Sequence, residues 1–261
     1  MALILASFAA ALGWVLLDSR RVVGSVPGDA PILGLAAVKS GFAVATEKGV
    51  YFSSDGETWS KVAKFGSKPS LATSGADDAF IWSDRILAKT SDLATFDVGA
   101  GSLLPAVAIS VDSAGNIYVA EDPRHYALVG PDGGLQRITA GPGPQDVIAI
   151  AGIPGEPVTL LVGGLNSGLW RSTDGGLHWR QILLTPTRAL LIDPSNAKKV
   201  LLGTAGGVLY SRDGGLRWFF SDLRSSVEAL SASGGRFYAL TQDRLLYSSE
   251  DGIQGWARFP N

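Results

Sequence analysis

A short hairpin pattern recurs along the chain and constrains its fold more than any other feature. In the copy GVLYSRDGGLRWF, an apolar stretch is followed by Ser-x-Asp-Gly and then by a Trp that opens a second apolar stretch. Six copies place an Asp 37, 40, 42, 39 and 38 residues apart, at Asp55, Asp92, Asp132, Asp174, Asp213 and Asp251. A repeat of about 40 residues is typical of the four-stranded blade of a β-propeller. The spacing therefore predicts an all-β fold with six blades.

The copies differ in how closely they follow the pattern. Three C-terminal copies keep the hydroxyl, the carboxylate and the indole, at Ser172, Asp174 and Trp179, at Ser211, Asp213 and Trp218, and at Ser249, Asp251 and Trp256. Two N-terminal copies are one residue shorter, at Ser53, Asp55 and Trp59 and at Thr90, Asp92 and Phe96. The third copy keeps Asp132 but has Gly130 and Arg137 in the Ser and Trp positions.

These residue types fit a tight hairpin. A carboxylate can accept backbone N–H groups that have no strand partner, and Gly tolerates the positive φ of such turns. The Trp ring is expected to pack over the turn and close the base of the hairpin. All three roles are structural. If the rings are buried, Trp179→Ala and Trp218→Ala should each cost about 3–5 kcal/mol of stability.

From about Pro31 to Pro260 the pattern resembles the Asp box, also called the bacterial neuraminidase repeat. Asp-box propellers include sialidases, xyloglucan-cleaving propellers, sortilin-type receptors and photosystem II assembly factors. In these families the box lies on the blade rim, away from any active site, so the resemblance implies the fold rather than the function. Sialidases also carry an Arg-Ile-Pro motif before the first box, which this chain lacks.

Residues 31–261 are accordingly predicted to form the propeller. In the fifth blade, for example, the expected strands are Ala189–Ile192, Val200–Thr204, Gly207–Ser211 and Trp218–Phe220. Four strands can be assigned to the first blade and four to the last. The ring is therefore expected to close end to end, and a contribution from a short strand at Val22-Val23 remains open.

The first 17 residues, MALILASFAAALGWVLL, are predicted to form a transmembrane anchor helix of about 25 Å. Trp14 would lie at the membrane interface, and Arg20 and Arg21 just beyond it, in a connector that spans residues 18–30. A signal peptide and a buried element of the propeller are the alternatives, although a signal peptide usually has a basic start. The positive-inside rule favours a cytoplasmic propeller, and a periplasmic propeller is the alternative.

Composition narrows the classes of function. The chain has 22 basic and 24 acidic residues and a net charge of −2, which disfavours a general nucleic-acid binder. It has no Cys and only two His residues, so thiolate and His-based metal sites are not expected. We expect neither a cofactor nor a small-molecule substrate.

A catalytic propeller usually places charged residues where the inner strands begin. The candidates there, Asp146, Arg188 and Glu228, are too sparse to predict catalysis. Two other groups are candidates for protein contact, against the alternative of an ordinary solvated surface. They are the loop residues Glu121, Asp122, Arg124 and His125, and the arginines Arg171 and Arg212, which lie shortly before the hairpin Asp in neighbouring blades.

The sequence thus favours a non-catalytic, membrane-anchored accessory subunit or assembly factor of a large membrane protein complex. The resemblance to photosystem assembly factors places a photosynthetic reaction centre first, although those factors typically have seven blades and are lumenal or periplasmic. The alternative is a degenerate sialidase- or glycosidase-like propeller that binds or cleaves glycans, for which exposed aromatic residues and two close carboxyls at the axis are expected. A sorting-receptor ectodomain is a third alternative, disfavoured because such domains are usually disulfide-bonded.

Overall fold

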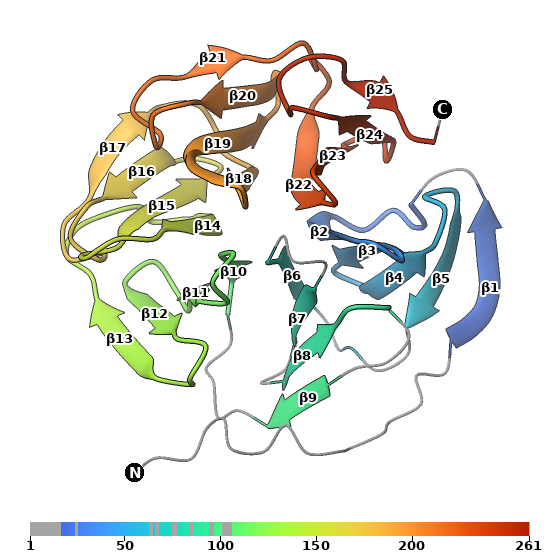
Figure 1. Cartoon of the computed structure of the whole chain (residues 1–261), viewed down its shortest axis with the longest axis horizontal. Coiled ribbons are helices and arrows are strands. Elements are labelled where there is room, and N and C mark those ends of the chain that lie inside the picture. Colours follow the sequence, from blue (N-terminus) through green and yellow to red (C-terminus); the bar gives the residue numbers. More distant parts are fainter. Residues whose placement is uncertain are drawn as a thin grey trace.

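The strands are arranged as six blades around a central axis (Figure 1). The computed structural model describes residues 17–23, 26–62, 65, 68–74, 78–83, 86–93, 97–100 and 106–260. Within these residues, each blade is an antiparallel sheet whose first strand lies at the axis. The predicted six-bladed, all-β propeller is therefore confirmed.

The strands of the first three blades follow one another outward from the axis. Blade one contains β2 (Ile32–Val38), β3 (Gly41–Thr46), β4 (Gly49–Ser53), β5 (Thr58–Val62) and, outside β5, β1 (Leu17–Val23). Blade two contains β6 (Ser70–Thr73), β7 (Ala79–Ser83), β8 (Ile86–Thr90) and β9 (Asp97–Ala100). Blade three contains β10 (Ala108–Val111), β11 (Ile117–Ala120), β12 (His125–Val129) and β13 (Leu135–Thr139).

The last three blades repeat this order. Blade four contains β14 (Val147–Ile153), β15 (Thr159–Gly164), β16 (Gly168–Ser172) and β17 (Arg180–Leu183). Blade five contains β18 (Ala189–Asp193), β19 (Asn196–Thr204), β20 (Gly207–Ser211) and β21 (Phe219–Phe220). Blade six contains β22 (Val227–Ser233), β23 (Arg236–Thr241), β24 (Leu246–Ser249) and β25 (Ala257–Arg258).

The outermost strands of blades four to six begin after the Trp rather than at it. In blade five, only Phe219 and Phe220 form the strand. The chain then turns toward blade six, where the N–H of Asp222 donates to the carbonyl of Ile253 at 3.0 Å. An outermost strand has one neighbouring strand instead of two, so fewer of its backbone groups are held by hydrogen bonds to another strand.

The ring closes by direct packing of blade six on blade one, as expected. Leu35 and Phe42 of blade one share a buried cluster with Ala229 and Leu240 of blade six. Across the same junction, the N–H of Ala37 donates to Ser231 Oγ at 2.9 Å. The seam is therefore a continuous apolar interface between two complete blades.

The N-terminal region differs from the prediction in one respect. Val22 and Val23 do belong to a strand, but this strand, β1, pairs antiparallel with β5 at the outer edge of blade one. The backbone of Arg20 and Arg21 therefore lies in a strand instead of a connector. Of the predicted anchor helix, residues 1–16, including Trp14, lie outside the described residues, and Leu17 begins β1. In the part of the chain that the structure describes, no helix has the length and apolar character needed to cross a membrane.

Candidate functional site

The repeated hairpin is held by hydrogen bonds within a few residues. In blade one, Ser53 Oγ donates to Asp55 Oδ1 at 2.9 Å and accepts the N–H of Gly56 at 2.8 Å. The same carboxylate oxygen accepts the N–H of Thr58 at 2.7 Å, and this bond is the main cause of a pKa of about 2 for Asp55. The indole of Trp59 donates to the Gly56 carbonyl at 3.2 Å and closes the base of the turn.

The hairpins of blades four to six repeat this arrangement with other side chains in the Thr position. The hydroxyls of Ser172, Ser211 and Ser249 donate to Asp174, Asp213 and Asp251 at 2.7, 2.9 and 3.2 Å. Asp174 also contacts His178 Nδ1, and Asp213 accepts a hydrogen bond from Arg217 Nε, both at 2.7 Å. The bond from the Arg217 side chain is the largest cause of the lowered pKa of Asp213.

The two degenerate hairpins keep part of the network. In blade two, Thr90 Oγ1 donates to Asp92 Oδ1 at 3.1 Å, and Phe96 lies outside the described residues. In blade three, Asp132 Oδ1 accepts the N–H of Gly134 at 3.0 Å. In blade three a carboxylate therefore still accepts a backbone N–H of the turn, although both the hydroxyl and the Trp have been replaced.

The four Trp side chains of the pattern are not equally buried. Trp59 is 0% exposed, because β1 lies outside β5 and Val26 packs in the same cluster. Trp179, Trp218 and Trp256 are only half-buried. Trp179 and Trp218 are therefore less buried than Trp59, because no further described strand covers the outer edges of blades four and five.

A ring of aliphatic side chains closes the axis. Each inner strand contributes one of them, and the six are Leu35, Leu71, Ile109, Ile150, Leu190 and Leu230. The ring separates two shallow funnels that open on opposite faces of the disc. All of these residues except Ile150 line both funnels.

The funnel on the face where the inner strands begin combines apolar and charged groups. Leu33, Val107 and Ile148 line it and are partly exposed. Across the funnel, Arg188 Nη1 donates to both carboxylate oxygens of Glu228 at 2.9 and 3.1 Å. The third charged residue expected there does not join them: Asp146 accepts the N–H groups of Asn166 at 2.5 Å and of Ser167 at 3.1 Å, within its own blade.

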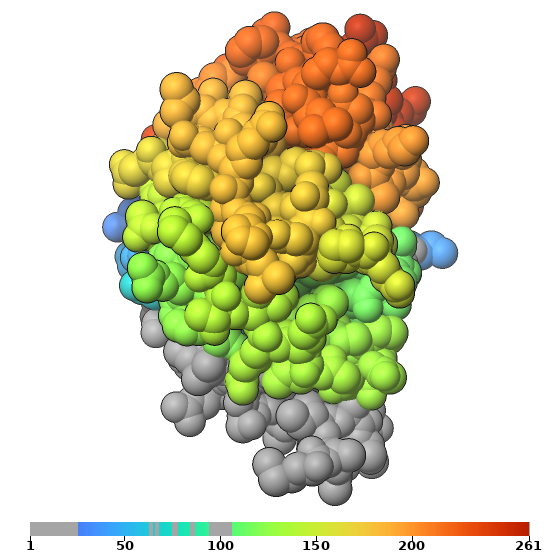
Figure 2. Space-filling model, turned by 90° about the vertical axis from the view of Figure 1, so that its left-hand side faces the viewer, coloured from blue at the N-terminus to red at the C-terminus, as the bar shows by residue number. Residues whose placement is uncertain are grey.

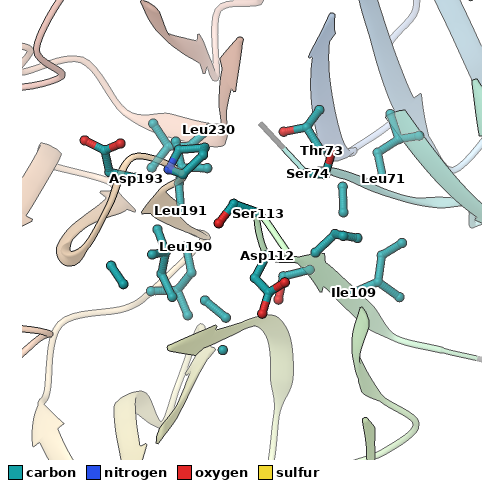
Figure 3. A pocket seen from close by; sticks show the side chains of 18 of the residues that line it. Leu71, Thr73, Ser74, Ile109, Asp112, Ser113, Leu190, Leu191, Asp193 and Leu230 are labelled. Atoms are coloured by element: carbon teal, nitrogen blue, oxygen red, sulfur yellow. The ribbon is translucent and has the colours of Figure 1, made fainter. Parts of the chain in front are cut away.

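The opposite funnel, of about 90 Å³, contains two carboxylates that the sequence analysis did not single out (Figure 3). Asp112 comes from blade three and accepts the phenol of Tyr118 at 2.9 Å, and Asp193 comes from blade five and accepts the N–H of Ser195 at 2.8 Å. Lys199 Nζ lies 3.2 Å from Asp193. Each carboxylate thus stabilises its own turn. The turn sequences Asp-Ser-Ala-Gly-Asn and Asp-Pro-Ser-Asn were the features of the sequence that could have identified these two residues. Among the described residues, no group of three or more His, Asp or Glu side chains has the arrangement of a metal site.

The loop that begins at Glu121 is held together by its own polar groups. Asp122 Oδ1 accepts the N–H groups of Arg124 at 2.7 Å and of His125 at 2.9 Å, and its other oxygen lies 2.7 Å from His125 Nδ1. Burial opposes ionisation of Asp122, but these hydrogen bonds outweigh it and lower the pKa. Glu121 accepts a bond of 3.4 Å from Arg137. The loop therefore presents few uncommitted polar groups to a partner.

Arginines and large apolar side chains are concentrated on β16, β17 and β21 and on the loops beside them in blades four and five, a surface that we call the arginine edge. It contains Arg171, Arg180, Arg212, Arg224, Leu177, Leu184, Leu216, Phe219 and Phe220. Leu184 is 81% exposed and Phe220 is 58% exposed. In the space-filling view of Figure 2, the green, yellow and orange surfaces of blades three, four and five lie next to one another. The sequence analysis identified Arg171 and Arg212 but missed the apolar members, whose exposure follows from the uncovered outer edges of blades four and five.

Two arginines of this edge lie directly opposite one another. Arg171 of β16 and Arg180 of β17 are cross-strand partners. Arg171 Nε donates to the Gly214 carbonyl in the next blade at 3.3 Å, and burial together with the positive charge of Arg180 lowers the Arg171 pKa. Arg212 is exposed, and its guanidinium lies 5.4 Å from the ring centre of Tyr210. The edge therefore carries positive charge that its own strands do not neutralise.

Comparisons with known proteins support the fold alone. No family model and no curated protein matches the chain. A solved structure described as YCF48 bound to D1 peptide aligns with 95% of this chain and 98% of its own, at 14% identity and a TM-score of 0.52. The WD40 β-propeller domain of Doa1 aligns with 93% of this chain and 88% of its own, at 13% identity and a TM-score of 0.58.

Proposed function

We propose that this chain is a non-catalytic, membrane-anchored propeller that acts as an accessory subunit, or as an assembly or stability factor, of a large membrane protein complex. A photosynthetic reaction centre is the first candidate. The arginine edge carries the proposal, because Arg and aromatic residues are enriched at protein interfaces and dominate their binding energy. Phe219, Phe220 and Leu184 supply exposed apolar area beside the guanidinium groups.

The opposition of Arg171 and Arg180 strengthens this argument. Like charges directly opposite on neighbouring strands destabilise a sheet. Among the described residues, no carboxylate lies within ion-pair distance of Arg180, Arg212 or Arg224. A partner that brings carboxylates to this edge would relieve the repulsion, so the arrangement is better suited to the complex than to the free protein.

The structural neighbour described as YCF48, a photosystem II assembly factor, is recorded with a D1 peptide. It supports the proposal by analogy of fold, since a propeller of similar outline is recorded there with a protein segment.

We further propose that the six hairpins are Asp boxes, on the strength of the Ser–Asp–backbone hydrogen bonds in blades one, four, five and six.

The proposed membrane attachment rests on the sequence. The anchor predicted over residues 1–17 would end at residue 16, because Leu17 belongs to β1. Trp14 would lie at the interface, and Arg20 and Arg21 favour a cytoplasmic propeller, with a periplasmic propeller as the alternative. The partner is an integral membrane protein complex, and neither nucleic acid nor a small-molecule substrate is involved.

Purification from native membranes tests this function. The full chain, tagged at its C-terminus, is solubilised in mild detergent, and the proteins of its size-exclusion peak are identified by mass spectrometry. We expect a stoichiometric integral-membrane complex that is lost in the variant Arg180→Glu. The control Lys39→Glu makes the same charge change in the β2–β3 turn of blade one and should leave the complex intact. A monomer that elutes alone would refute the proposal.

A glycan-binding or glycan-cleaving propeller is the second candidate, favoured by the exposed rings of Phe219 and Phe220. Aromatic rings can pack against sugar faces, but these rings lie on an outer edge, and the carboxylates of the axial funnel belong to separate blades. Binding to a glycan array that is lost in Phe220→Ala, without a co-purifying membrane protein, would favour this alternative.

A further inference from the structure

A groove separates the outer parts of blades three and four. It has a volume of about 560 Å³, within the range of binding clefts. One wall is formed by four consecutive residues of β13, 136–139, and the other by the loop 154–158 together with Asp174 and Leu177 of blade four. This blade three–four groove lies away from the arginine edge proper, and only Leu177 belongs to both.

The β13 wall of the groove is an unpaired strand edge. β13 is outermost in its sheet, and Ala140 just beyond it donates its N–H inward to Arg124 at 2.8 Å. In an antiparallel ladder alternate residues point their N–H and C=O groups the same way. The residues that present backbone groups outward are therefore Leu135, Arg137 and Thr139.

Gly141 follows Leu135, Arg137 and Thr139 in this alternation, and its hydrogen bond shows the direction of the outward backbone groups. Gly141 donates its N–H to the Leu177 carbonyl of blade four at 3.1 Å. The outward backbone groups of β13 thus face the same side as the groove. The outward N–H and C=O groups of the three alternate residues Leu135, Arg137 and Thr139 therefore remain available to an incoming strand.

Blade one shows that this propeller accepts a fifth strand. β1 pairs antiparallel with β5 at the outer edge of blade one, through partners such as Leu17 with Val62 and Val23 with Thr58. The edge of β13 is geometrically equivalent, because both β5 and β13 are the strand that follows the repeated hairpin.

Side chains lining the groove define the chemistry of its occupant. Leu128, Ile138 and Val158 offer apolar surface, and Leu177 is 52% exposed. Glu156 is exposed and makes no ion pair among the described residues. An incoming strand with alternating aliphatic residues and a basic residue near Glu156 would match both features.

We propose that an extended segment of a partner protein, with alternating aliphatic side chains and a Lys or Arg, adds to β13 as the fifth strand of blade three. The inference deepens the proposed docking function and names a second contact surface. Main-chain hydrogen bonds would hold the segment, and the groove would select its side chains.

The test uses the full chain in detergent and a fluorescein-labelled heptapeptide, acetyl-Lys-Val-Thr-Val-Thr-Val-Lys-amide, followed by fluorescence anisotropy. Two further peptides carry backbone N-methyl groups on one or the other set of alternate residues. Pairing with one edge uses only alternate amides, so one pattern should weaken binding at least about tenfold and the other should not. Equal binding of both methylated peptides, or no binding of the parent peptide, would overturn the proposal.

Variants of the protein give a second readout. Arg137→Pro removes an outward N–H without removing an inward one, so it should weaken binding at least about tenfold. The comparison variant Arg137→Ala keeps the N–H, so it should lose much less binding than Arg137→Pro. Equal loss in both variants would overturn the strand mechanism.

Hydrogen exchange keeps the test independent of these variants. In the free protein the amides of Leu135, Arg137 and Thr139 should exchange faster than those of Gln136 and Ile138, and the parent peptide should protect the fast set alone. Protection of the slow set instead would contradict the assigned edge. These measurements do not depend on co-purification, so failure of the docking function and failure of the strand site give different results.

Discussion

Replacement of Trp59 by Ala tests how the propeller ring is held together. The indole is 0% exposed, and it packs in a cluster that joins blades one and six. A Trp of this kind buries about 150–250 Å², which corresponds to about 4–6 kcal/mol at 25 cal/mol per Å². The lost hydrogen bond to the Gly56 carbonyl adds about 1 kcal/mol, and relaxation of the site offsets part of the sum. We expect Trp59→Ala to lower the free energy of unfolding by about 4–5 kcal/mol.

The assay is equilibrium unfolding in urea, followed by far-ultraviolet circular dichroism, with thermal unfolding as a second measurement. A loss of this size lowers the melting temperature by roughly 10 °C in a domain of this length. Trp218→Ala is the matched control, because it occupies the same place in the hairpin and also bonds a Gly carbonyl, at 3.1 Å, but is only half-buried. We expect it to cost about half as much. If the two variants are equally destabilised, burial at the blade seam does not determine the role of these residues.

Three further predictions follow from the local geometry. Hydrogen bonds lower the pKa of Asp55 from 3.8 to about 2. The contribution of this carboxylate to stability should therefore be complete above pH 4 and should disappear as the pH falls to about 2. Unfolding of the parent and of Asp55→Asn, compared between pH 2 and 5, measures this contribution. Gly41 has φ +143°, and an added Cβ would lie 2.2 Å from the Ser53 carbonyl oxygen. Gly41→Ala should therefore lower the free energy of unfolding, measured in urea, by about 2 kcal/mol or more. An unchanged midpoint would show that the hairpin shifts without strain. Arg180→Ala removes the charge repulsion between residue 180 and Arg171 on the neighbouring strand. It should leave stability unchanged or raise it by a few tenths of a kcal/mol, and it should weaken co-purification of the partner. A clear loss of stability would mean that the arginine pair is structural.

The local features of the fold could be predicted because they depend on residues close in sequence. Ser211, Asp213 and Gly215 lie within five positions, and their hydrogen bonds follow from the turn they form. The repeat spacing then determines the number of blades, since each hairpin joins the last two strands of one sheet. Most assigned strands agree with the structure to within one or two residues for the same reason.

The candidate site could be predicted only in part. Arg171 and Arg212 were found because each lies within three residues of the Asp of a recognisable turn. The exposure of Phe220 and Leu184 could not be inferred, because it follows from the uncovered outer edges of blades four and five. The ion pair between Arg188 and Glu228 joins residues 40 positions apart, and pattern alone does not show that they meet.

By itself the sequence determined the repeat, the six blades and the hydrogen-bonded hairpins, because short-range turn chemistry and strand periodicity act within a single blade. Only the tertiary structure decided which side chains are buried and which surfaces stay open. The rotation from one blade to the next brings six aliphatic residues together at the axis, and the placement of β1 buries Trp59 while the edges of β13 and β21 remain uncovered. These contacts join distant parts of the chain, so they depend on how complete blades pack against one another.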